Sequence, residues 1–139
     1  MAPESIGTDL AAISRLRDGH IAALNSGNPD AWADAFTDDG VQMPPNAPAN
    51  VGKDMVRSWN RGFLTLFQTE FSLSVDEIQV VADWAFERGT YHITLNPRAG
   101  GDAIRDVGKY ITIYHRQSGG NWGIARDIWN SNTPPPGAG

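Results

Sequence analysis

The spacing of apolar residues changes once along this chain, and that change most restricts how it can fold. Before Thr69 apolar residues recur at helical spacing, whereas beyond it they alternate with polar residues. Helices followed by a run of strands predict an α+β domain with helices packed on one sheet. A chain of 139 residues suits a single core. We expect one domain over residues 8–132, with flexible ends at residues 1–7 and 133–139.

Three helices are predicted before the change. The first covers residues 8–24 and ends at the break Asn25–Asn28. Asn28 followed by proline forms a typical helix start, and the short second helix should run to about Phe36. After a turn at residues 37–40, a short extended segment and a proline-rich loop, a third helix with a wide apolar stripe follows Gly52.

Four strands are predicted after the change. In the first, the alternation reverses phase near Asp76, which indicates a β-bulge and a curved sheet. The connections are too short for helical crossovers, so we expect an antiparallel sheet. Helices on its concave side should leave a conical cavity, and a second copy of the chain should cover the convex side, which is expected to carry Tyr and Ile. The strands are expected at residues 71–80, 83–95, 104–116 and 122–130.

Composition excludes several classes of function. A net charge of -5 and the absence of cysteine disfavour nucleic acid and membrane partners, thiolate nucleophiles and cysteine-containing zinc sites. The chain has no phosphate-binding glycine loop, serine-nucleophile elbow, zinc-protease helix or calcium loop. We therefore expect no cofactor and no metal. No long apolar run and no leader-like N-terminus are present, so we expect a cytoplasmic protein.

Two helical residues are candidates for a pocket. His20 lies on the apolar stripe of the first predicted helix, where an imidazole either satisfies its hydrogen bonds in the core or faces a polar cavity. Trp59 lies on the stripe of the third helix, together with Phe63, and serves either as core or as a pocket wall.

The second and last strands carry charged residues on both faces, which is costly unless the charges pair or border a wet cavity. Glu87 or Asp127 could pair with an arginine, or these residues could form a polar pocket. His92, His115 and Asp127 could hold a metal, but their spacing does not support such a site.

Two further features have simple structural interpretations. Asp38 and Asp39 precede a glycine and most simply form a turn, with a catalytic role as the alternative. Tyr110 and Tyr114 share one side of their strand and are expected at an interface or in the core.

Several short segments carry a resemblance to a known family: Ala22–Asp30, Phe36–Gly40, Met43–Pro45, Val51–Asp54, Asp106–Tyr110 and Trp122–Asn130. Taken with the order of elements, they resemble the SnoaL-like group of the nuclear transport factor 2-like superfamily. That superfamily also holds ketosteroid isomerase, scytalone dehydratase and limonene-epoxide hydrolase. The resemblance implies a cone-shaped α+β barrel but not one reaction, because this scaffold hosts isomerases, dehydratases, cyclases and binding modules.

Matching the chain to ketosteroid isomerase places the oxyanion tyrosine of that enzyme at His20. Its general-base aspartate falls near Pro44 and its protonated aspartate near Ile113, so two of its three catalytic groups are absent here. The resemblance therefore does not imply steroid isomerisation by that mechanism.

The same matching makes Trp59 a pocket wall and turns Asp127 and Trp129 outward. We expect a homodimer that binds a small, partly apolar, anionic or enolisable molecule, either as a cofactor-independent isomerase, cyclase or dehydratase or as a non-catalytic module. His20 would be the acid or base, with Arg88 or Arg126 stabilising negative charge. A hydrolase using Asp127 is a third hypothesis, and requires Asp127 to face inward beside an arginine. The residues expected to face inward are Phe86, Arg88, Thr90, His92, Arg126, Ile128 and Asn130.

Overall fold

The computed structural model describes residues 3–134 and confirms an α+β fold with three helices and one curved sheet. The alternating strands that follow the last helix form most of the sheet, as the change of period predicts. The helices are α1 (Pro3–Asn25), α2 (Pro29–Asp34) and α3 (Lys53–Leu66), and the strands are β1 (Phe36–Met43), β2 (Asn50–Val51), β3 (Phe67–Val81), β4 (Trp84–Pro97), β5 (Ile104–Arg116) and β6 (Trp122–Ser131).

Local sequence explains where the first two helices end and begin. α1 starts at Pro3, earlier than the predicted start at Thr8, and the chain then leaves the helix through Gly27, which has a positive φ of 72°. The side chain of Asn28 accepts a hydrogen bond from the backbone N–H of Ala31 at 3.0 Å and so caps α2. Residues 1–2 and 135–139 of the predicted flexible ends lie outside the described residues.

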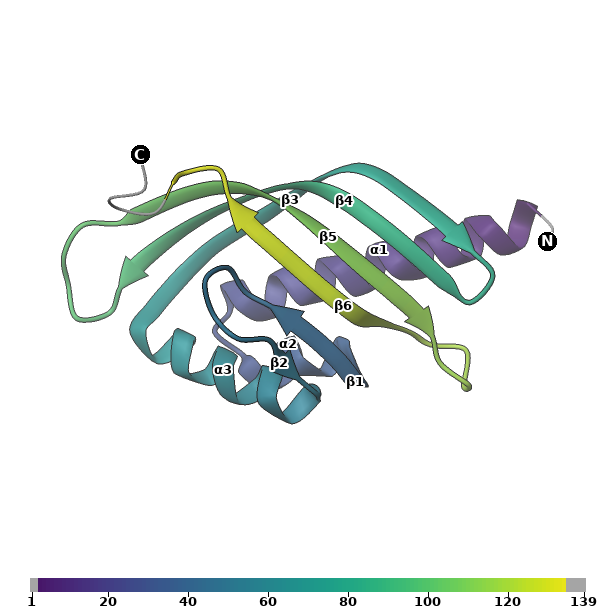
Figure 1. Ribbon diagram of the computed structural model, residues 1–139, viewed down its shortest axis with the longest axis horizontal. Helices are drawn as coiled ribbons and strands as arrows, with labels where there is room; N and C mark the ends of the chain where they lie inside the picture. Colours follow the sequence, from purple (N-terminus) through teal and green to yellow (C-terminus); the bar gives the residue numbers. More distant parts are fainter. Residues whose placement is uncertain (1–2, 135–139) are drawn as a thin grey trace.

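The strands form one open sheet in the order β2-β1-β6-β5-β4-β3. The long strands β3, β4 and β5 arch over α1, while α2 and α3 lie near β1 and β2 (Figure 1). β2 and β3 form the two edges, so the sheet curves around the helices without closing into a barrel.

Strand β1 differs from two sequence-based predictions. Residues 37–40 were expected to form a turn, but they lie within the strand. β1 also pairs in parallel with β6, although an antiparallel sheet was predicted. The parallel pair is possible because α3 and three long strands separate β1 from β6 along the chain, which leaves ample length for the crossover.

Two irregularities decide which side chains face the helices. The pairing of β3 with β4 shifts between Val75 and Glu77, which confirms the predicted bulge near Asp76. A second shift occurs where Tyr114 pairs with Ile124 and Ile113 pairs with Arg126, so Ala125 is an extra residue in β6. The faces of β6 therefore exchange at Ala125.

The hydrophobic core lies between the helices and the concave face of the sheet. Ile13 and Leu24 of α1, Val56 of α3 and Ile124 of β6 are all buried in it. α1 packs mainly against β3, at one edge of the sheet, and α3 mainly against β1, toward the other edge, so the core extends across the concave face. In the part of the chain that the structure describes, no helix is long and apolar enough to span a membrane.

Candidate functional site

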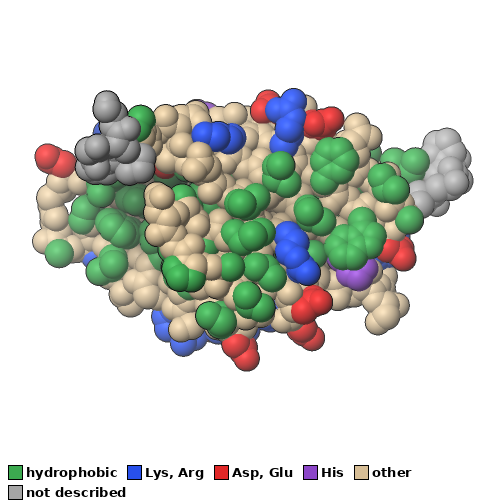
Figure 2. Space-filling model, in the orientation of Figure 1, with side chains coloured by type: hydrophobic (Ala, Val, Ile, Leu, Met, Phe, Trp, Pro, Cys, Tyr) green, Lys and Arg blue, Asp and Glu red, His purple; other side chains and the backbone are tan. Residues whose placement is uncertain are grey.

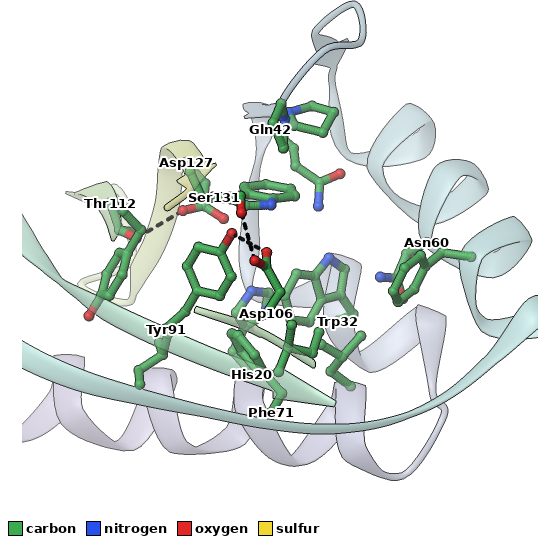
Figure 3. Close-up of a pocket in the computed structure, with 18 of the residues that line it drawn as sticks. His20, Trp32, Gln42, Asn60, Phe71, Tyr91, Asp106, Thr112, Asp127 and Ser131 are labelled. Atoms are coloured by element: carbon green, nitrogen blue, oxygen red, sulfur yellow. Dashed lines mark hydrogen bonds between the residues drawn. The ribbon is translucent and has the colours of Figure 1, made fainter. Parts of the chain in front are cut away.

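A cavity of about 530 Å³ lies between the helices and the concave face of the sheet. All three helices and five of the strands contribute side chains to it, and Figure 3 shows ten of these residues labelled. Most of its wall is apolar, a composition typical of a small-molecule site. The apolar residues include Pro44, Trp59, Phe63, Phe71, Leu73, Ile93, Leu95 and Trp129.

The inward face of β6 is opposite to the one expected from the resemblance. Asp127 and Trp129 line the cavity, whereas Ile128 and Asn130 are exposed on the outer face. Arg126 also lies outside the cavity lining and donates hydrogen bonds to backbone carbonyl groups of β1 and β6. The extra residue at Ala125 reverses the alternation of inward and outward side chains, and the matching to ketosteroid isomerase did not allow for this extra residue.

The expected face of β4 is also wrong, although β4 itself contains no extra residue. Tyr91 lines the cavity and Glu87 is fully buried behind it, while Phe86, Arg88 and His92 are exposed. Arg88 forms an ion pair on the outer face with Glu77, at 2.9 Å between Nε and Oε1. Thr90 is on this outer set too, because side chains two positions apart in a strand share a face.

Asp127 lines the cavity, and burial there changes the ionisation of its carboxyl group. Its Oδ1 accepts a hydrogen bond from the hydroxyl group of Thr112 at 3.0 Å (Figure 3). Burial raises the pKa of Asp127 to about 7; the Thr112 hydrogen bond opposes this shift, and the charge of Glu87 adds to it. Asp127 can therefore both take up and release a proton near neutral pH.

A second carboxylate, Glu87, is bound by three side chains next to the cavity. Arg17 of α1 donates two hydrogen bonds to its Oε1, from Nε at 2.9 Å and from Nη2 at 2.5 Å. Tyr110 and Tyr114 donate their hydroxyl groups to Glu87 at 2.6 and 3.0 Å. Burial and the nearby Glu87 raise the pKa of both tyrosines, so they remain protonated donors. This arrangement is the structural pairing that the sequence left open for Glu87.

A third carboxylate, Asp106, lies on β5 beside the end of β6. The hydroxyl groups of Tyr91 and Ser131 donate hydrogen bonds to it at 2.8 and 2.6 Å (Figure 3). Because Asp106 lines the cavity together with these two residues, it forms a polar section of an otherwise apolar wall.

His20 lines the cavity and stacks on Trp32 at 3.4 Å between ring centroids. Burial lowers the pKa of His20 to about 3, and the backbone of Trp32 partly opposes this shift. Neither ring nitrogen of His20 forms a hydrogen bond of good geometry. The imidazole is therefore neutral at physiological pH, so the protonated imidazolium form that would act as a general acid is not populated. A role for His20 as acid or base stays a prediction, and Asp127 is better matched to that task.

Trp59 and Phe63 of α3 both line the cavity, which places the expected pocket wall on this helix. Their rings stack at 5.7 Å, and Trp59 also meets Trp129 of β6 edge to face at 6.2 Å. Aromatic contacts of this kind hold α3 at a fixed distance from β6 and define the width of the cavity there.

The residues considered for a metal site are separated by the sheet. His115 stacks on the exposed ring of Trp84 at 3.9 Å, and His92 is exposed, whereas Asp127 faces the cavity. Within residues 3–134 no three histidine, aspartate or glutamate side chains are grouped as metal ligands would be. Asp38 is exposed on β1, 3.5 Å from Lys53, and is not part of the cavity lining.

Sequence reasoning missed the polar residues of the concave face. Two glycine–tyrosine pairs were the available signal, because Gly89 pairs with Tyr110 and Gly108 pairs with Tyr91 across β4 and β5. A Cβ at either glycine would overlap with the ring of its partner, so each ring lies flat over a glycine. This alternation identifies Tyr91, Tyr110 and, by the same period, Glu87 as one face. Arg17 and Asn60, on helices, gave no such signal.

A profile of the family described as SnoaL-like domain matches residues 9–123. A ketosteroid isomerase-like protein from Erwinia carotovora atroseptica is 28% identical, with a TM-score of 0.82, over 91% of this chain and 98% of that one. A conserved protein from Planctomyces limnophilus is 25% identical, with a TM-score of 0.82, over 90% of this chain and 98% of that one.

A nuclear transport factor 2-like superfamily protein from Salmonella enterica shares the fold, with a TM-score of 0.79 at 14% identity, over 99% of both chains. Among curated proteins, no match was found.

Proposed function

Because the chain belongs to the SnoaL-like domain family of the nuclear transport factor 2-like superfamily, we propose that it binds a small organic molecule. We also propose that it moves a proton on this molecule, because the cavity holds a carboxyl group with a pKa near neutral pH. The reaction class is cofactor-independent isomerisation, cyclisation or dehydration. The observation that carries this proposal is Asp127 itself, which faces an apolar cavity and has a pKa of about 7.

Asp127 has the properties that such chemistry needs. Its carboxylate would take a proton from a carbon next to a carbonyl group, forming an enol or enolate, and the resulting carboxylic acid would return the proton to another carbon. No electron donor or acceptor is needed, since one carbon–hydrogen bond breaks and another forms. The similarity to a ketosteroid isomerase-like protein supports this class of reaction.

The neutral isomerisation probe cyclohex-3-en-1-one tests the proposal, because conversion to the conjugated enone is followed by ultraviolet absorbance. We expect a rate above that of buffer that rises with pH through about 7, as the carboxylate of Asp127 forms. Asp127→Asn should lower the rate roughly 100-fold or more, the usual contribution of a general base. Asp102→Asn, which changes an exposed aspartate in the β4–β5 connection, is the matched control.

A non-catalytic binding module is the competing function. It predicts that the probe binds, for example by displacing a fluorescent naphthalene dye from the cavity, while its isomerisation stays at the buffer rate. Isomerisation that Asp127→Asn leaves unchanged would show that Asp127 is not the base.

We also propose that a second copy of the chain covers the outer face of the sheet. This face carries isoleucine rather than tyrosine, because the tyrosines of β5 point into the cavity. Trp84, Ile111 and Ile128 are 46%, 47% and 46% exposed, and Figure 2 shows hydrophobic side chains spread across this face. An apolar surface that extends over several strands is typical of a buried interface.

Sedimentation analysis tests the dimer. We expect a dimer for the native chain and a monomer for Ile111→Lys, since a lysine at the centre of the outer face would bury an unpaired charge. The control is Val51→Lys, which introduces the same charge at an exposed position on β2. A native chain that sediments as a monomer at high micromolar concentration would refute this interface. We also propose the cytoplasmic location that was expected from the sequence, and cell fractionation tests it.

A further inference from the structure

Four buried side chains that line the cavity have nitrogen atoms without a hydrogen-bond partner among the described residues: His20, Trp32, Gln42 and Asn60, whose Oδ1 is also unpartnered. Because the neutral imidazole of His20 has one donor and one acceptor nitrogen, most of the donors belong to the other three: the indole N–H of Trp32, the amide N–H groups of Gln42 and the side-chain amide of Asn60. These residues are 5%, 0% and 1% exposed, and all three line the cavity. A buried donor without an acceptor is costly, which makes this side of the cavity suited to a ligand that supplies one.

The three donors come from α2, β1 and α3, which pack against one another at one end of the molecule. Figure 3 shows the nitrogen atoms of Trp32, Gln42 and Asn60 turned toward the same part of the cavity. The Gln42 amide is oriented by Asn50, whose Nδ2 donates to Gln42 Oε1 at 3.2 Å. This hydrogen bond occupies the acceptor atom of Gln42 and leaves its donors directed to the cavity.

The charges around the cavity favour an uncharged ligand. Of the two arginines that line the cavity, Arg17 is paired with Glu87, and Arg105 is exposed at the beginning of β5. The inner wall carries the carboxyl groups of Asp106 and Asp127. Arg88 and Arg126, which were expected to attract an anion, lie outside the cavity lining. A carboxylate ligand at the three donors would therefore be desolvated beside other carboxylates. Arg105, the lining arginine that is not paired with Glu87, is exposed to solvent, so its charge offsets little of this cost.

We infer that Trp32, Gln42 and Asn60 form a subsite for the acceptor oxygen of an uncharged, largely apolar compound, so that the cavity selects neutral carbonyl compounds over carboxylates of the same shape. This inference rests on the proposed function, because it assumes that the cavity binds small molecules. It adds which ligands bind and which residues select them. Asp127 lies on the sheet, and the three donors lie on the helical side and β1.

Three probes of similar shape test the inference by titration calorimetry: 2-acetonaphthone, 2-isopropylnaphthalene and 2-naphthoate. We expect the ketone to bind most tightly and the carboxylate most weakly. In nitrogen-15 spectra, the indole N–H signal of Trp32 should move on addition of the ketone in the direction of a stronger hydrogen bond. The hydrocarbon should not produce this shift, because it has no acceptor.

Gln42→Met removes donors at nearly constant length and should weaken ketone binding roughly two- to tenfold, the effect of losing one hydrogen bond, with hydrocarbon binding unchanged. Asn50→Ala breaks the same Asn50–Gln42 contact and releases the orientation of the Gln42 amide but keeps its donors, so it should weaken ketone binding less than Gln42→Met does. Trp32→Phe is a second, independent variant with the same expectation as Gln42→Met. Their fold is checked by circular dichroism.

Two negative results have different meanings. If the hydrocarbon or the carboxylate binds as tightly as the ketone, or if Gln42→Met weakens all three probes equally, the donor subsite is wrong while the cavity remains a binding site. If none of the three probes binds the native protein, the proposed function fails, and this inference fails with it.

Discussion

Replacing Asp127 by asparagine should change the stability of the protein by an amount that depends on pH. The substitution keeps the shape of the side chain and an oxygen that can accept the Thr112 hydrogen bond, but it removes the ionisable group. In the native state burial raises the pKa of Asp127 to about 7, whereas an unfolded aspartate titrates near its ordinary value of 3.8. Between these two values the native state holds a proton that the unfolded state has released.

The sign follows from proton linkage. Because the native state binds more protons than the unfolded state between about pH 4 and 7, ionisation of Asp127 lowers the free energy of unfolding as pH rises. With these pKa values the penalty is about 1.7 kcal/mol at pH 5 and about 4 kcal/mol at pH 8. Asp127→Asn carries no such penalty, so its stability relative to the native chain should rise by roughly 2–3 kcal/mol between these pH values.

Urea unfolding at pH 5 and pH 8, followed by tryptophan fluorescence, measures this difference. The comparison uses native protein, Asp127→Asn and Asp102→Asn, whose exposed carboxylate is solvated in both states. We expect the Asp102→Asn difference to be nearly independent of pH. If the Asp127→Asn difference is also constant from pH 5 to 8, Asp127 does not titrate in that range and cannot be the poised acid–base group.

Two other substitutions test the structure around the cavity. Glu87→Gln should lower the free energy of unfolding by about 2–4 kcal/mol, because Arg17 loses its buried partner. The same substitution should lower the pKa of Asp127, measured by carbon-13 titration, because it removes the charge of Glu87. The control Glu77→Gln, in an exposed ion pair, should lower the free energy of unfolding by less than about 1 kcal/mol. Gly108→Ala should lower the free energy of unfolding, measured in urea, by about 1–3 kcal/mol, because a Cβ would overlap with neighbouring atoms. The control Gly19→Ala lies in the middle of α1 with no atoms near its Cβ. It should raise the free energy of unfolding by up to about 1 kcal/mol, because alanine favours a helix more than glycine does. A neutral Gly108→Ala or a silent Glu87→Gln would contradict the packing and pairing described above.

The positions of the elements follow closely from local sequence. β5 spans Ile104–Arg116, as its alternation predicts, and β6 ends one residue beyond the predicted Asn130. The β3 bulge was also predictable, because the apolar phase reverses within the strand itself. These features depend on side chains that are near one another in the chain, which is why periodicity detects them.

The lining of the cavity was predicted only in part. The apolar stripes of their helices left Trp59 and His20 as either core or pocket residues, and the matching to ketosteroid isomerase assigned both to the pocket. Both line the cavity, as does Phe63. The outer residues Phe86 and Arg88 were assigned to the wrong face, although β4 pairs with β5 without a register shift. Matching to ketosteroid isomerase transferred an alternation that this chain does not share.

By itself the sequence determined the class of fold, the order of its elements and the family, since the change from helical to alternating spacing and the turn residues are local properties. Only the tertiary structure decided which carboxyl group faces the cavity. The extra residue at Ala125 is recognised as a bulge only by its pairing with β5, and that pairing turns Asp127 inward. Its raised pKa then arises from burial by the surrounding residues, a property that no stretch of sequence contains.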